Sequence, residues 1–178
     1  MRFGEFAQYL EKLEGTSSRN EMTQILAELL GKLDKGEVEK AVNLLLGQLV
    51  PSYKEVVFNI ADQVMVSAIA KAFDRSLESV KSLYRKKGDL GNVVYEIAPD
   101  KGKGMSVGEV YESLYQIASE DGGGSGERKV SAMAGLLAGV GKESSRFIVR
   151  ITLGKLRLGF SDKTIIDALS YIEKGDKS

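Results

Sequence analysis

The chain contains a second, diverged copy of part of itself. Residues 18–49 align without a gap on residues 125–156, and nine of the 32 aligned positions are identical. The copies end on the same pattern, Leu46-Gly47-x-Leu49 in the first and Leu153-Gly154-x-Leu156 in the second. Such a duplication predicts two related helical units around an approximate two-fold axis. That symmetry suits a partner with an approximate two-fold of its own, and duplex DNA is one such partner.

The hydrophobic pattern predicts an almost entirely helical chain. Apolar residues recur at three- and four-residue spacing, and both Ser18 with Glu21 and Ser106 with Glu109 have the spacing of a capping box. Residues 48–59, which include Pro51, are expected to form a loop with one short extended piece. The predicted helices span about residues 3–14, 18–33, 35–46, 61–73, 76–85, 88–99, 106–120, 125–140, 142–153 and 161–172. The expected fold class is all-α, a multi-helix bundle made of two pseudo-two-fold-related helical repeats.

Composition limits the chemistry that the chain can perform. The 178 residues include no histidine and no cysteine, so nucleophilic catalysis by a Ser-His or Cys-His pair is excluded, as are disulfides and thiolate metal sites. No catalytic or metal-binding residue is therefore predicted. Positive charge is uneven: residues 142–163 hold six cations and two anions, a net +4, while the whole chain is neutral. A local basic segment on a neutral protein indicates one confined anionic contact, although a solvated helix face would look the same.

Two loop–helix starts occupy equivalent places in the two copies. The first is Gly15-Thr16-Ser17-Ser18-Arg19 and the second is Gly123-Gly124-Ser125-Gly126-Glu127-Arg128-Lys129. Free amides and the helix dipole make a helix N-terminus a ready phosphate site, and glycine lets the backbone approach the ligand closely. Plain helix capping explains the same residues. Equivalent placement of both starts, each with a cation, favours phosphate binding. The candidate contacts are Thr16, Ser17, Arg19, Ser125, Gly126, Arg128 and Lys129.

A basic strip follows the second copy of the Leu-Gly-x-Leu pattern. Lys155 and Arg157 alternate with leucines, so an extended backbone would turn the leucines inward and both cations outward. Gly154 and Gly159 remove side-chain bulk at the two ends. Arg150 lies about one helical turn earlier and is expected to support the strip. A helix C-terminus whose cations simply favour its dipole is the alternative; a phosphate-binding strip is the sharper hypothesis.

These residues resemble a known family. The run from Arg146 to Gly159, R-F-I-V-R-I-T-L-G-K-L-R-L-G, resembles a stretch of the N-terminal DNA-binding domain of ATP-dependent DNA ligases of the archaeal and eukaryotic type. The loop at residues 124–129, the Thr16–Arg19 segment and Gly88-Asp89-Leu90-Gly91 also match patterns of that family, and the similarity covers nearly all 178 residues. The archaeal type is the most similar.

The resemblance implies one DNA-binding domain over residues 1–178, with internal repeats at about 3–73 and 106–172 and a boundary at 100–105. It implies sequence-independent binding of nicked duplex DNA through the minor groove and the phosphate backbone. Thr16, Ser17 and Arg19 would contact one strand, and the residues of the second start would contact the other. Gly154, Lys155, Arg157 and Gly159 would line the groove. The parent ligase would seal nicks in replication, repair and recombination, using ATP and Mg.

Departures from the family pattern restrict these expectations. The family's catalytic lysine lies in a K-x-D-G motif, and no such motif occurs in the chain. This fragment is therefore expected to bind DNA without a cofactor. Ligation is expected to be the task of the parent protein's catalytic and OB-fold domains. Gln48 stands where relatives often carry arginine, which predicts a weaker grip by the first copy. No sliding-clamp motif is found in Asp100–Met105. Neither a membrane span nor a targeting signal is expected, which is typical of a cytoplasmic protein, or a nuclear one in a eukaryote. The alternative function is a helical-repeat scaffold that binds other proteins.

Overall fold

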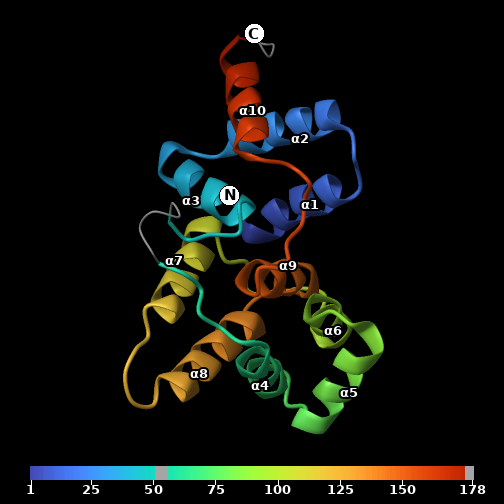
Figure 1. Cartoon of the computed structure of the whole chain (residues 1–178), viewed down its shortest axis with the longest axis vertical. Coiled ribbons are helices and arrows are strands. Elements are labelled where there is room, and N and C mark those ends of the chain that lie inside the picture. The colour runs from blue at the N-terminus through green and yellow to red at the C-terminus, as the bar shows by residue number, and fades with distance from the viewer. Residues whose placement is uncertain (51–55, 175–178) are drawn as a thin grey trace.

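The computed structural model describes residues 1–50 and 56–174, and within these residues the chain is helical with no strand. The predicted all-α class is therefore confirmed (Figure 1). Residues 48–50 and 56–59 form no strand, and residues 51–55 lie outside the described part, so the short extended piece expected there stays a prediction. The helices are α1 Phe3–Glu14, α2 Arg19–Lys32, α3 Lys35–Leu45, α4 Asp62–Ala72, α5 Leu77–Lys87, α6 Leu90–Ile97, α7 Val107–Ala118, α8 Ser125–Ala138, α9 Lys142–Thr152 and α10 Asp162–Lys174.

The helix starts follow from capping side chains that the sequence displays. Ser18 accepts from the amide of Glu21 at 3.3 Å, and Ser106 accepts from the amide of Glu109 at 3.1 Å. Asp89 caps α6 in the same way, accepting from the amide of Asn92 at 3.0 Å. These bonds satisfy amides that have no partner inside the helix. The predicted capping positions are thus confirmed, although the Glu21 carboxylate accepts from the Thr16 hydroxyl and so does not complete a reciprocal box.

The two copies end their third helices with the same backbone turn. In α9 the amide of Lys155 donates to the carbonyl of Arg150 at 2.8 Å, and Gly154 is left-handed with φ +68°. In α3 the amide of Gln48 donates to the carbonyl of Asn43 at 2.9 Å, and Gly47 has φ +71°. This six-to-one bond with a left-handed glycine is the Schellman motif. The duplicated Leu-Gly-x-Leu pattern therefore encodes one turn geometry used twice.

Helix packing exchanges elements between the two halves. α10 packs on α2 and α4 packs on α8, while α1 packs on α9 and α3 on α7. Exchanging α1 with α7, α2 with α8, α3 with α9 and α4 with α10 leaves this set of pairs unchanged. In Figure 1 the pair α10 and α2 lies at one end of the molecule, and the pair α4 and α8 lies toward the other. Helices α5 and α6 have no counterpart among the described helices of the second half.

The starts of α1 and α7 lie against each other in a reciprocal way. The amide of Phe3 donates to the carbonyl of Met105 at 2.8 Å, and the amide of Val107 donates to the carbonyl of Met1 at 3.0 Å. Arg2 and Ser106 form an isolated antiparallel bridge at this point. Because the two bonds are reciprocal, they agree with the approximate two-fold axis that the sequence duplication predicts, and the axis itself stays a prediction.

Large apolar side chains fill the interior between the two halves. Phe3, Phe6, Leu10 and Leu13 of α1 are buried, as are Phe147, Ile148 and Ile151 of α9. Removing this apolar surface from water is the dominant favourable contribution to folding. Because helices of both halves contribute to one cluster, the core fixes the positions of the connecting segments that reach the surface.

Candidate nucleic-acid interface

The segment after α9 has the alternation that the sequence predicts. Lys155 and Arg157 are exposed, Leu156 is half-buried, and Leu158 keeps only 7% of its surface exposed. The leucines therefore hold the segment on the core while both cations point to solvent. A Cβ at Gly154 would meet nothing within 4 Å, so the strip is open there. This part of the prediction is confirmed as geometry, and its role in binding remains a prediction.

Two observations place the first loop–helix start beside the strip. Arg150 Nη1 donates to Glu14 Oε1 at 2.7 Å, which joins α9 to the last residue of α1. A Cβ at Gly159 would lie 3.7 Å from Met22 Cε in the first turn of α2, so the far end of the strip runs along that turn. The structure thus brings Thr16, Ser17 and Arg19 together with the strip. Ser17 and Arg19 are exposed and Thr16 is half-buried.

Arg150 supports the strip from inside the molecule. Its side chain keeps only 13% of its surface exposed. Besides Glu14, it contacts Asp89 Oδ2 at 3.1 Å through Nε and 3.0 Å through Nη2, and Asn92 Oδ1 at 2.9 Å. A guanidinium held at this many points is fixed in position. The Arg150 carbonyl accepts a hydrogen bond from the amide of Lys155. By holding Arg150, residues Glu14, Asp89 and Asn92 therefore fix the direction in which the strip leaves α9.

The Gly88-Asp89-Leu90-Gly91 element accounts for this arrangement. Gly88 ends α5 in a left-handed turn with φ +72°, Asp89 caps α6 and binds Arg150, and Leu90 is buried. A Cβ at Gly91 would lie 2.8 Å from Arg150 Nε, closer than real side chains approach. Glycine is therefore required where α6 meets α9. The motif was visible in the sequence, but the roles of Asp89 and Gly91 depend on an arginine about sixty residues away.

Arg146 does not extend the exposed strip. Its guanidinium carbon lies 4.6 Å from the ring centroid of Tyr95 and 4.8 Å from that of Phe147, and its Nε is buried without a hydrogen-bond partner. Stacking on aromatic rings is a common role for arginine. Arg146 and Arg150 share one side of α9, and that side faces α6, where they contact Tyr95 and Asn92.

The second loop–helix start is organised differently from the first. Gly124 caps α8 in a left-handed conformation without a side-chain bond, and the amides of Gly126 and Glu127 donate to no described residue. Ser125 is half-buried and Gly126 is exposed. Uncapped first-turn amides are the donors that a phosphate needs. The first-turn amides of this start are therefore available to a ligand. In the first start, the Ser18 hydroxyl already accepts from one first-turn amide, that of Glu21.

Two predicted contacts of the second start are engaged within the chain. Arg128 donates to Glu120 and to the carbonyls of Asp121 and Gly123, each at 2.7 Å, and so closes the loop before α8. Lys129 keeps only 7% of its surface exposed and its ammonium donates to the carbonyl of Asn59 at 3.1 Å. The expectation that Lys129 offers a surface cation is thus not met in this structure. Nothing near Lys129 in the sequence signals the Asn59 carbonyl that receives it.

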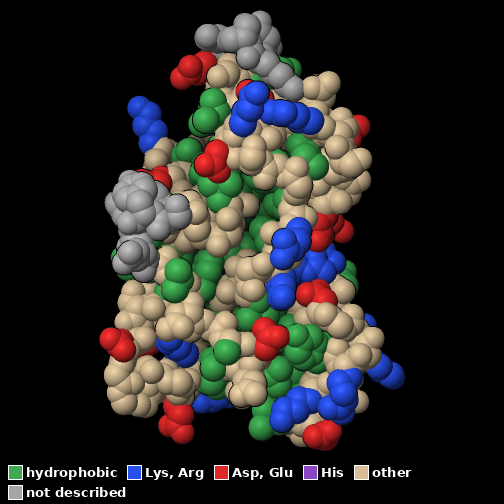
Figure 2. All heavy atoms as spheres, in the orientation of Figure 1, with side chains coloured by type: hydrophobic (Ala, Val, Ile, Leu, Met, Phe, Trp, Pro, Cys, Tyr) green, Lys and Arg blue, Asp and Glu red, His purple; other side chains and the backbone are tan. Residues whose placement is uncertain are grey.

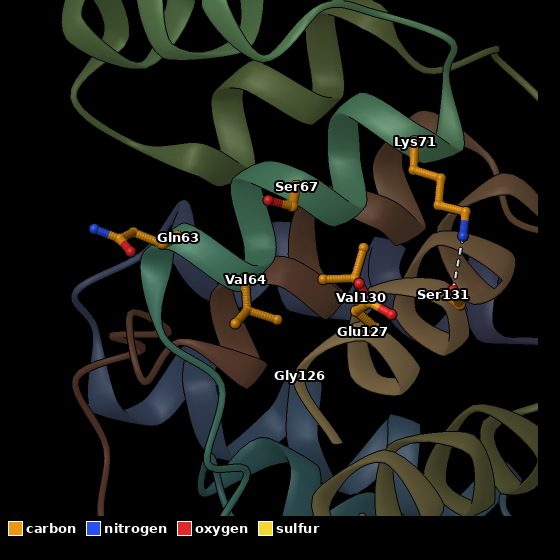
Figure 3. A pocket seen from close by; sticks show the side chains of 8 residues that line it. All are labelled: Gln63, Val64, Ser67, Lys71, Gly126, Glu127, Val130 and Ser131. Carbon is orange, nitrogen blue, oxygen red and sulfur yellow. Dashed lines mark hydrogen bonds between the residues drawn. The ribbon is translucent and has the colours of Figure 1, made fainter. Parts of the chain in front are cut away.

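A groove of about 730 Å³ runs beside the second start, between α4 and α8. Figure 3 shows Lys71 extending from α4 to Ser131 of α8, where its Nζ donates to the hydroxyl at 2.7 Å. Gly126 lies at the rim, and the lining holds one cation, Lys71, and one anion, Glu127. The groove carries no net charge, and it joins a helix of the first half to one of the second.

The two starts lie far apart along the molecule. Figure 1 shows the first turn of α2 near one end of the long axis and that of α8 toward the other. The strip after α9 crosses the same view in front of α1 to reach α10. Figure 2 shows Lys and Arg side chains gathered on this face at the level of α9, and a second group over α10. Cations and open amides are thus distributed over a length of surface and do not converge on one pocket.

Comparison with known proteins identifies relatives over the whole chain. A family model described as "DNA ligase N terminus" matches residues 2–170. A "Probable DNA ligase" of Dictyoglomus turgidum is 39% identical over 178 residues, which is all of this chain and 31% of the relative. A protein of the same name from Dictyoglomus thermophilum is 41% identical over 99% of the chain and 30% of the relative.

An archaeal relative gives the same picture. "DNA ligase 1" of Methanosarcina acetivorans is 36% identical over 99% of this chain, which again corresponds to 30% of the relative. The chain therefore spans about a third of the length of the curated relatives that it matches. Among the described residues, no helix combines the length and apolarity needed to cross a membrane.

Proposed function

The chain belongs to the DNA ligase N-terminus family, and from this premise we propose that it is the DNA-binding part of an ATP-dependent DNA ligase. It binds nicked duplex DNA without reading sequence, through the minor groove and the phosphate backbone. The adenylylation and sealing chemistry, with its ATP and Mg, belongs to other domains of the ligase, which acts in replication, repair and recombination. The proposal agrees with the lack of histidine, cysteine and a K-x-D-G lysine in the chain.

The single observation that supports binding most directly is the strip Gly154–Gly159. The buried Leu158 and the half-buried Leu156 anchor it, and two exposed cations project from it. A left-handed glycine at each end leaves the backbone open. Phosphate contacts position a protein on DNA without reading bases. The strip offers cations and backbone but no Asn or Gln to read base edges, so the expected binding is independent of sequence.

The arrangement of the other predicted contacts agrees with this function. Arg19 and Ser17 lie beside the strip, and the open amides at Gly126 and Glu127 lie toward the far end of the molecule. Two anchoring points joined by a rigid helical core can hold a duplex on both sides of a break. The core fixes their spacing, so the domain need not reorganise when it binds.

Salt-dependent binding of a nicked duplex tests the proposal. If about six phosphates are neutralised, log K falls with log salt with a slope of about −5. Lys155→Ala combined with Arg157→Ala is expected to weaken binding about tenfold or more at moderate salt and to reduce that slope by about 2. Both side chains are exposed, so circular dichroism and the melting temperature should not change.

The matched control is Lys81→Ala with Lys86→Ala. These lysines are exposed on α5, and their loss changes the net charge equally. Figure 1 shows α5 at the end of the molecule opposite α10, which the strip reaches. Equal weakening by the two double variants would show that only total charge matters, and the strip would lose its assigned role. Binding that ignores salt, or no binding of nicked DNA, would favour the protein-interaction scaffold instead.

A further inference from the structure

The first-turn arginine of each start has a carboxylate partner in the unbound chain. Arg19 Nη2 lies 3.4 Å from Asp167 Oδ2, and Arg128 Nε lies 2.7 Å from Glu120 Oε2. Both arginines are among the predicted phosphate contacts. A carboxylate and a phosphate each present two oxygens that can accept paired hydrogen bonds from one guanidinium. A partner carboxylate therefore competes with any phosphate that the arginine would bind.

The two arginines differ in how firmly they are held. Arg128 also donates to two carbonyls of its own loop, so it is part of the loop's structure. The Arg19 guanidinium has Asp167 as its one hydrogen-bond and ion-pair partner among the described residues, and the Arg19 side chain is 55% exposed. An exposed ion pair of this kind contributes little to stability. Arg19 can therefore change partners at small cost, and Arg128 cannot.

Asp167 is fixed in place by the helix that carries it. It lies on α10, whose residues Ile165 and Ala168 are buried against the core where α10 packs on α2. The Asp167 carboxylate is itself only 23% exposed. It cannot move far when DNA arrives, so it stays beside Arg19 and repels a phosphate bound there.

We propose that Asp167 is an affinity-determining residue of this domain. In the unbound chain the Asp167 carboxylate pairs with the Arg19 guanidinium. When DNA binds, a phosphate of the DNA backbone replaces Asp167 as the partner of Arg19. The inference rests on the proposed function and extends it by naming a residue that lowers the affinity for DNA. Because α10 belongs to the second half and α2 to the first, the exchange also links the two copies at the DNA surface.

A double-mutant cycle tests the exchange with Asp167→Asn, Arg19→Ala and the combined variant. Binding of a nicked duplex is followed by fluorescence anisotropy over a range of salt concentrations. Asp167→Asn is expected to tighten binding about threefold to fivefold at low salt, the range of one exposed charge pair. The slope against log salt should stay the same, because the same phosphates are neutralised. In the Arg19→Ala background the tightening should disappear, since coupled residues are non-additive.

The control is Asp162→Asn on the same helix. Asp162 is exposed in the first turn of α10 and forms no ion pair among the described residues, yet its loss changes the net charge equally. Equal tightening by Asp162→Asn and Asp167→Asn, or undiminished tightening without Arg19, would overturn the exchange. If the unaltered chain bound nicked DNA normally in that experiment, the proposed function would stand while the inference failed. Absence of any binding would instead overturn both.

Discussion

Placing a methyl group at Gly91 should loosen the contact on which the strip depends. Gly91 lies in the first turn of α6, where α6 packs against α9. A Cβ there would lie 2.8 Å from Arg150 Nε, 2.9 Å from Arg150 Cγ and 3.1 Å from the carbonyl oxygen of Arg146. The last of these is backbone, which a side-chain rotation cannot relieve. Gly91→Ala therefore requires α6 and α9 to separate or Arg150 to leave Asp89.

Two opposing contributions set the size of the effect. Extra bulk in a well-packed contact costs about 1–3 kcal/mol, while alanine is favoured over glycine within a helix by up to about 1 kcal/mol. The net expectation is a loss of about 1–2 kcal/mol in the free energy of unfolding. For a chain of this size that corresponds to a melting temperature lower by about 2–8 °C. The strip should also bind DNA less tightly, because the Arg150 carbonyl that caps Lys155 moves with its residue.

Gly135→Ala is the matched control. Gly135 lies on the exposed side of α8, and a Cβ there would meet nothing within 4 Å. This substitution should stabilise the chain by up to about 1 kcal/mol. Thermal unfolding followed by circular dichroism compares the two variants directly. If Gly91→Ala were as stable as Gly135→Ala, the close approach of α6 and α9 would not be what requires glycine.

Two further predictions concern one partly buried and one buried ionisable group, Glu143 and Lys129. The neighbouring Glu11 carboxyl, and then burial, raise the pKa of Glu143 to about 7, so the stability this group contributes is complete below its ordinary pKa of about 4.5 and is lost as pH rises through 7. The melting temperature of the unaltered chain relative to Glu143→Gln should therefore be higher at pH 5 than at pH 8, and a pH-independent difference would contradict the coupling. Lys129→Met should leave the salt slope of DNA binding unchanged, because its ammonium is buried against Asn59; a slope smaller by about 0.9 would show that Lys129 reaches a phosphate.

Local features of the fold could be predicted from the sequence because their causes are local. Ser18, Asp34, Ser76 and Ser106 each cap a helix through a bond to a residue three positions later. The turn at Gly154 depends on the five residues before it, and the inward and outward alternation of Leu156 to Leu158 depends on adjacent residues. Interactions of this range leave a recognisable pattern in the chain.

Partners that are distant in sequence could not be predicted. The sequence predicts Arg150 as a support for the strip, but it gives no sign that Glu14, Asp89 and Asn92 hold this arginine inside the molecule. Lys129 appeared to be a surface cation, and Asn59, seventy residues earlier, makes it an interior one. The Gly88-Asp89-Leu90-Gly91 motif is recognisable in the sequence, but the close approach of Gly91 to Arg150 depends on a residue about sixty positions away.

The similarity between the two copies does not reveal that helices of one copy pack on helices of the other. Each copy contains a helix that the other copy covers, since α10 packs on α2 and α4 packs on α8. A unit made of one copy alone would leave the buried faces of α2 and α4 in water, so the duplicated unit is not the folding unit. The two loop–helix starts are therefore held by a single shared core. On the proposed function, that core acts as a rigid spacer between two phosphate contacts, which explains why a domain without catalytic residues keeps a large, interlocked interior.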